Sequence, residues 1–130
     1  MAHQDQLAKR RLRASVVGAW ALKIALAAVF LLAAAAKLAG HPKMVAEFGL
    51  IGLGQGLRIF TGLVEVAGAL LLLWPRTAFV GAVILLGVCA GAFVAQVGPL
   101  HGDLAHVVVL ALLLALAAWL ARPHDRRAAA

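Results

Sequence analysis

Long apolar stretches divide this chain into four segments. The first covers about residues 17–39 and is interrupted only by Lys23, and the others cover about 57–74, 77–97 and 103–121. A helix of about 20 residues crosses a hydrocarbon core of about 30 Å, so each segment is long enough. Pro75, Pro99 and Pro123 follow the later segments, and proline does not continue a helix. The pattern predicts an all-α polytopic membrane protein, a bundle of four transmembrane helices.

The connection between the first two segments, about residues 39–56, is too apolar for an ordinary solvated loop. Large apolar side chains alternate there with Gly49, Gly52, Gly54 and Gly56. Glycine at this density disfavours a regular helix. We expect a short helix around residues 42–48, followed by a flexible, apolar Gly-rich loop that lies at the membrane interface as a partial lid.

One membrane domain with two basic ends follows from this division. We expect a basic segment at residues 1–14, a single transmembrane domain at 15–121 and a short basic tail at 122–130. A cleaved secretory signal is an alternative for the first segment, because basic residues, an apolar core and the small residues at 33–36 resemble its three regions. Cleavage would leave three spans.

The composition excludes a soluble single-domain enzyme. Hydrophobic residues make up 65% of the chain, and the 13 glycines raise the share to about three quarters, against about half in soluble domains. A soluble fold of this size buries only about two thirds of its surface. Disorder is excluded as well, because charged residues are only 13% of the chain. The single cysteine, Cys89, excludes thiol exchange within the chain and reads as a small apolar residue.

The net charge of +7 is an orientation signal rather than a nucleic-acid interface. With a cytoplasmic N-terminus, that side holds Lys9, Arg10, Arg11, Arg13, Arg76, Arg122, Arg126 and Arg127, whereas the outer side holds Lys37, Lys43 and Arg58. The positive-inside rule therefore places both termini in the cytoplasm of a multi-pass protein of the cell membrane. Trp20, Trp74 and Trp119 fall at the cytoplasmic ends as an interfacial belt. We expect a lipid bilayer, with anionic lipid, as a partner and no nucleic acid.

Glu65 is the ionisable residue that the bilayer tolerates least. It lies about 12 Å along the second predicted helix, where an unpaired charge costs several kcal/mol. Three- and four-residue spacings predict one inward-facing stripe: Arg58, Thr61, Gly62, Glu65 and Ala69. Glu65 is therefore a candidate for proton exchange. The alternative is a structural ion pair with Arg58 or Lys37.

Further polar residues gather in the outer half of the predicted bundle. Lys37, Arg58, Gln96 and Asp103 are candidates for substrate binding, and His106 is a second candidate for proton exchange. Asp103 and His106 are three residues apart and share a helix face. Each residue also has a structural explanation: Lys37 and Arg58 snorkel to head groups, Asp103 caps the last helix, and Gln96 packs between helices. No metal site is expected.

A spacing of small residues marks the third predicted helix. Gly87 and Gly91 are four residues apart, with Ala90 and Gly81 nearby. This spacing lets helix backbones approach closely. It predicts close packing within the bundle or a homo-oligomer formed through the Gly87/Gly91 face.

Taken together, these residues resemble the DoxX and DoxX-like membrane proteins. The resemblance spans about residues 17–120 and rests on Ala36-Lys37-Leu38, the connection with Phe48, the run Gly62-x-x-Glu65-x-x-Gly68-Ala69-Leu70-Leu71-Leu72, a third helix rich in small residues, and a histidine early in the fourth. It implies a four-helix membrane protein whose relatives are linked to quinone-coupled sulfur oxidation and to oxidative or quinone stress. This chain lacks the cysteine pair of redox-active relatives, so dithiol chemistry does not carry over.

Three functional hypotheses remain open. In the first, the chain is a membrane subunit of a quinone-linked oxidoreductase, with a bound quinone, no covalent cofactor and a redox partner protein as electron source. Desolvation would favour a neutral Glu65 that donates a proton, with His106 relaying it past Asp103. In the second, the chain is a proton-coupled transporter of small molecules. In the third, it is a non-catalytic assembly protein in which the polar cluster locks the bundle.

Overall fold

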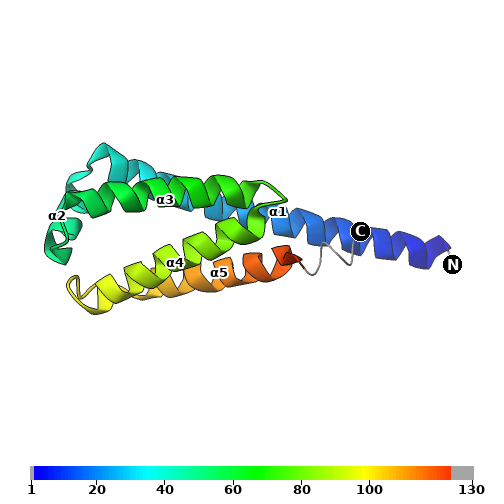
Figure 1. The fold of residues 1–130 in the computed structure, drawn as a ribbon. Helices are drawn as coiled ribbons and strands as arrows, with labels where there is room; N and C mark the ends of the chain where they lie inside the picture. Colours follow the sequence, from blue (N-terminus) through cyan, green and yellow to red (C-terminus); the bar gives the residue numbers. More distant parts are fainter. Residues whose placement is uncertain (1, 124–130) are drawn as a thin grey trace.

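The computed structural model describes residues 2–123, and this part of the chain consists of helices joined by short turns, without a strand (Figure 1). The helices are α1 (Ala2–Ala39), α2 (Pro42–Ile51), α3 (Gln55–Leu73), α4 (Ala78–Val97) and α5 (Ala105–Ala121). The predicted polytopic all-α architecture is thus confirmed. The predicted tail extends beyond the described residues, and Arg126 and Arg127 lie outside them.

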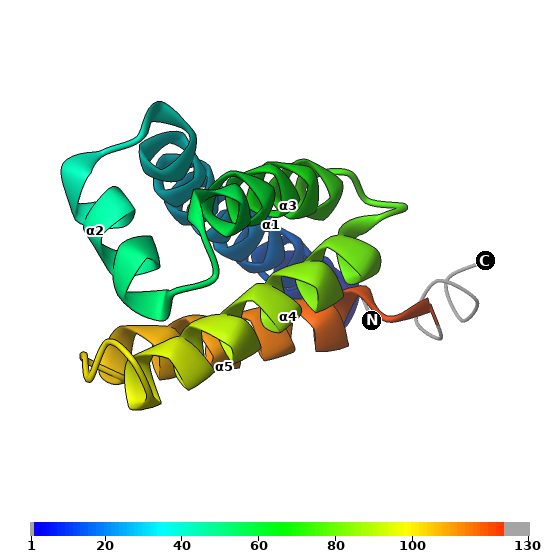
Figure 2. The ribbon, with the colours of Figure 1, turned by 60° about the vertical axis from the view of Figure 1, so that its left-hand side comes forward.

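The four long helices form a bundle. α3 packs between α1 and α4, α4 packs on α5, and a smaller contact between α5 and α1 closes the arrangement (Figure 2). Small and aliphatic side chains fill the core, among them Leu26, Ala34, Leu72, Leu85 and Leu114. Large apolar side chains are exposed around the outside: Leu63, Leu70, Val94 and Leu112 are each more than half exposed. An outer surface of this kind suits lipid rather than water.

Three of the helices, α1, α3 and α4, are long and apolar enough to cross a membrane. α5 is apolar as well, but its 17 residues make it shorter. The chain is therefore a polytopic helical membrane protein.

α1 is longer than the sequence predicts. It has 38 residues, about 57 Å at a rise of ~1.5 Å per residue, and its N-terminal part extends beyond the bundle (Figure 1). Residues 2–18 are all exposed there. From residue 2 onward, the basic segment predicted at residues 1–14 thus belongs to the first helix without a break. Leucine, alanine, lysine and arginine are good helix formers, and no glycine or proline occurs before Gly18.

The connection between α1 and α3 is mostly helix rather than a Gly-rich loop. Pro42 stands at the start of α2, and His41 caps it by accepting a hydrogen bond from the Lys43 N–H at Nδ1 (3.2 Å). Gly52 ends α2 in the left-handed conformation (φ 80°), and its N–H donates to the Phe48 carbonyl. These caps extend the helix past Phe48 to Ile51, because they satisfy the ends of a helix that contains only one internal glycine, Gly49.

α3 and α4 approach each other through glycine. A side chain at Gly81 would collide with the backbone of α3: its Cβ would lie 2.6 Å from the Gly68 carbonyl oxygen and would also meet the Leu72 nitrogen. A Cβ at Gly68 would lie 2.8 Å from Leu85. Because the two helices are antiparallel, these contacts set their register, with Gly68 level with Leu85.

Candidate functional site

Lys37 and Glu65 form a buried ion pair between α1 and α3. Lys37 Nζ lies 2.8 Å from Glu65 Oε1, and the two side chains are only 13% and 2% exposed. Glu65 is the one charged residue in the buried core of the described chain. A buried charge requires a partner of opposite sign, and Lys37 in the last turn of α1 supplies it.

The small residues of α3 make this approach possible. Gly62, Glu65 and Ala69 are buried, as the predicted stripe requires, while Arg58 and Thr61 are half-buried. A Cβ on Gly62 would lie 3.0 Å from the Leu38 side chain and 3.3 Å from Lys37 Cβ. Gly62 therefore lets the end of α1 come close enough for Lys37 to reach Glu65, one turn further along α3.

Arg58 binds the backbone beside the pair rather than the carboxylate. Its Nη1 donates to the Lys37 carbonyl oxygen, and its Nε donates to Gln55 Oε1 (2.8 Å). The Gln55 amide in turn donates to the Val45 carbonyl oxygen on α2 (3.1 Å). A chain of hydrogen bonds thus connects α2, the start of α3 and the end of α1. Sequence reasoning missed Gln55; its signal was a polar residue three positions before Arg58 in an otherwise apolar segment.

Cys89 lies on α4 at the level of Glu65. Gly68 is level with Leu85, so Glu65, about one turn earlier in α3, is level with the residue one turn later in the antiparallel α4. Cys89 is a free thiol and is 4% exposed. Its burial agrees with the interpretation of Cys89 as a small apolar residue.

Gln96, Asp103 and His106 belong to a separate group at the α4–α5 turn. This turn and α2 lie at the same end of the bundle (Figure 1). Asp103 Oδ1 accepts the Ala105 N–H (2.9 Å), and Asp103 Oδ2 lies 3.9 Å from His106 Nδ1. Both side chains are more than half exposed, and among residues 2–123 no hydrogen bond or ion pair joins them to Glu65. The Gln96 side chain packs against Gly102, whose N–H donates to the Gln96 carbonyl (3.1 Å).

The structure therefore brings together Lys37, Arg58 and Glu65, but not the other three candidates. Lys37 and Glu65 contact each other through charged atoms, whereas Arg58 contacts the Lys37 backbone. Within the described residues no group of three or more His, Cys, Asp or Glu side chains is placed to hold a metal ion.

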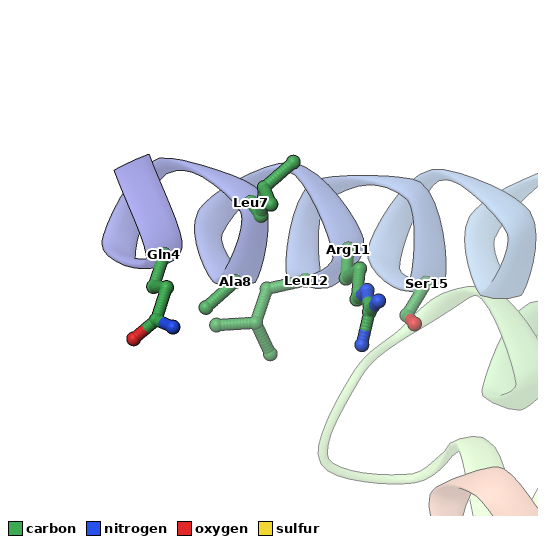
Figure 3. Close-up of a pocket in the computed structure, with 6 residues that line it drawn as sticks. All are labelled: Gln4, Leu7, Ala8, Arg11, Leu12 and Ser15. Carbon is green, nitrogen blue, oxygen red and sulfur yellow. The ribbon is translucent and has the colours of Figure 1, made fainter. Parts of the chain in front are cut away.

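An open hollow runs along the N-terminal part of α1, away from this site (Figure 3). The residues that line it all come from this one helix and are exposed: Gln4, Leu7, Ala8, Arg11, Leu12 and Ser15. Because no second element covers it, it is a surface of one helix and not an enclosed site.

Comparison with known proteins identifies the family of the chain. The sequence profile described as the DoxX-like family matches residues 21–120. The chain belongs to the DoxX-like family. The matched region begins inside α1 and contains Lys37, Arg58 and Glu65, while the protruding start of α1 lies outside it. No curated protein and no solved structure matches the chain.

Proposed function

We propose that this DoxX-like protein is a membrane subunit of a quinone-linked oxidoreductase or redox-stress system. The buried Lys37–Glu65 pair, whose second carboxylate oxygen has no hydrogen-bond partner in the described chain, is the observation that carries the proposal. In this role the pair is a polar, proton-exchanging site in the outer half of the bundle, and a partner protein supplies the electrons.

The proposed topology has four spans in the cell membrane and both termini in the cytoplasm. α5 is about 26 Å long at ~1.5 Å per residue, at the lower end of the range for a transmembrane helix. Two aromatic contacts support a cytoplasmic interface at the end of the bundle opposite α2. Lys23 Nζ lies 3.9 Å from the centre of the Trp20 ring, and Arg122 lies 3.7 Å from that of Trp119. A cationic residue over an indole suits the head-group region.

The residues of the pair fit a quinone oxygen. Glu65 Oε2 is buried and has no partner, and the Lys37 ammonium has three N–H donors, of which the pair with Glu65 Oε1 engages one. Lys37 would hold the ligand oxygen by donating to it, and the Glu65 carboxylate would take up the proton that this oxygen carries in the quinol form and return it to the reduced ring. A bound quinone supplies the capacity to carry two electrons and two protons. Asp103, His106 and Gln96 remain predicted contributors at the same end of the bundle.

Quinone analysis of the purified protein tests the proposal. The chain is purified from its native membrane, and extracted lipids are assayed for quinone at a known ratio to protein. We expect bound quinone, counted as the sum of its oxidised and reduced forms, with the wild type and its loss in Glu65→Gln. Glu47→Gln is the matched control, because it removes a partly exposed carboxylate on α2 that pairs weakly with Lys43 (4.0 Å). An equal quinone content in wild type, Glu65→Gln and empty-membrane preparations would refute the proposal.

A non-catalytic assembly role is the second candidate, and the contacts of Lys37 favour it. Its side chain pairs with Glu65 while its carbonyl accepts from Arg58, so one residue fastens α1 to α3 twice. In that case Glu65→Gln lowers the stability of the protein and leaves redox-linked phenotypes in the cell intact. Partners proposed for either role are a redox protein and a second copy of the chain bound through the exposed Gly87/Gly91 face.

A further inference from the structure

The two oxygens of the Glu65 carboxylate differ in their contacts. Oε1 faces the Lys37 ammonium at 2.8 Å, whereas Oε2 is buried and has no hydrogen-bond partner among residues 2–123. An ionised carboxylate only accepts hydrogen bonds, and a buried acceptor without a donor is costly. The arrangement therefore calls for a group that brings a hydrogen atom to Oε2.

The Lys37 ammonium limits which chemical groups could donate this hydrogen atom to Glu65 Oε2. Lys37 Nζ keeps N–H donors that the pair with Glu65 does not engage. A ligand atom between Nζ and Oε2 must therefore accept one hydrogen bond and donate another. A hydroxyl oxygen does both, but a carbonyl or ether oxygen only accepts and leaves Oε2 without a partner.

We propose that the Lys37–Glu65 pair binds the hydroxyl group of a membrane-soluble phenol or quinol in preference to the corresponding carbonyl or ether. The hydroxyl donates its hydrogen to Glu65 Oε2 and accepts from Lys37 Nζ. This inference rests on the proposed function only in treating the pair as a ligand site, and it names the reduced form of the ring as the form that the site selects.

The surroundings of the pair suit an apolar ring. Gly62 presents no side chain, and Leu38, which lies over it, is 39% exposed. The outer surface of the bundle near this end carries further exposed leucine and valine side chains, among them Leu53 and Val97. The ligand would thus enter from the lipid rather than from water.

A pair of probes that differ only in the hydroxyl hydrogen tests this selectivity. The full chain is reconstituted in lipid nanodiscs, and binding of 2-naphthol and of 2-methoxynaphthalene is measured by equilibrium dialysis against empty nanodiscs. Neither probe requires a redox reaction. We expect 2-naphthol to bind at least about tenfold more tightly than its methyl ether, because a hydrogen bond to an ionised group is among the strong ones. Glu65→Gln should reduce this ratio to below about threefold, and Glu47→Gln should leave it unchanged.

Each contrary result would overturn the inference. These results are equal binding of the two probes to wild type, no saturable binding of either, and a preference that survives Glu65→Gln. The fluorescence of bound 2-naphthol tests the contact with Glu65 in the wild type alone, since excited naphthol is a strong acid and gives its proton to a carboxylate in contact with it. We therefore expect naphtholate emission from the protein-bound probe. Emission from neutral naphthol alone would contradict contact with a carboxylate. The quinone assay tests the proposed function independently of this inference. Selective binding of naphthol without co-purified quinone would refute the proposed function and leave the inference intact.

Discussion

Removal of Lys37 should destabilise the protein far more than removal of an ordinary surface lysine. At 2.8 Å, two unit charges attract each other by about 6 kcal/mol at an effective dielectric constant of about 20. In Lys37→Met the Glu65 carboxylate would remain buried without a counter-charge, and it would take up a proton. Protonating an ordinary glutamate at pH 7 costs about 3.7 kcal/mol, which sets the scale of the expected loss at about 3–4 kcal/mol.

Unfolding in mixed micelles, titrated with a denaturing detergent and followed by helical circular dichroism, measures this loss. Lys43→Met is the control, because Lys43 is 72% exposed and its nitrogen lies 4.0 Å from Glu47, so its removal should cost less than about 1 kcal/mol. The double variant Lys37→Met/Glu65→Gln should recover at least about 2 kcal/mol relative to Lys37→Met, because glutamine is neutral without the cost of taking up a proton. A loss of about 1 kcal/mol or less for Lys37→Met, or a double variant no more stable than Lys37→Met, would refute the reasoning.

Three further changes follow from the packing. Gly81→Ala should lower the free energy of unfolding by about 1–3 kcal/mol, because its Cβ meets the backbone of α3. Gly87→Ala should have little effect, because a Cβ at Gly87 has nothing within 4 Å. Equal losses for the two variants in the same titration would contradict the register of α3 and α4. Gln55→Ala should speed hydrogen exchange in α2 and leave exchange in α4 unchanged, because the Gln55 amide donates a hydrogen bond to the Val45 carbonyl on α2. Exchange in α2 as slow as in the wild type would contradict this role of Gln55. Gly87→Leu with Gly91→Leu should abolish cross-linked dimers in membranes, and persistent dimers would rule out that face.

The long helices were predictable because burial in lipid imposes a simple pattern. Apolar runs of about 20 residues ending near proline mark α3 and α4 to within a few residues. Residues 2–14 lack that signal, yet they are helical, since local helix propensity continues α1 where no glycine or proline stops it. α2 was only partly predictable, because the capping contacts of His41 and Gly52 outweigh the low helix propensity of the glycines around them.

The site was predictable as a set of residues but not as a geometry. The cost of a charge in a membrane helix singles out Glu65 without a structure. The sequence leaves Lys37 and Arg58 as equal candidates for the ion-pair partner of Glu65, because both are predicted in the same outer half of the bundle as Glu65. Only the packing of Leu38 on Gly62 decides for Lys37, and it leaves Arg58 on the carbonyl at the end of α1. The exposed position of His106 likewise depends on the turn around Asp103, which spacing does not describe.

Infrared spectroscopy of the Glu65 carboxylate tests the central claim most directly. The difference spectrum of wild type minus Glu65→Gln, recorded in nanodiscs at neutral pH, contains the bands of the Glu65 carboxyl group as positive signals and those of the glutamine amide as negative ones. We predict the bands of an ionised carboxylate, shifted when 2-naphthol is added and unchanged when its methyl ether is added. The carbonyl band of a protonated carboxylic acid in the free wild type, with no response to either probe, would contradict both the ion pair with Lys37 and the ligand site built on it.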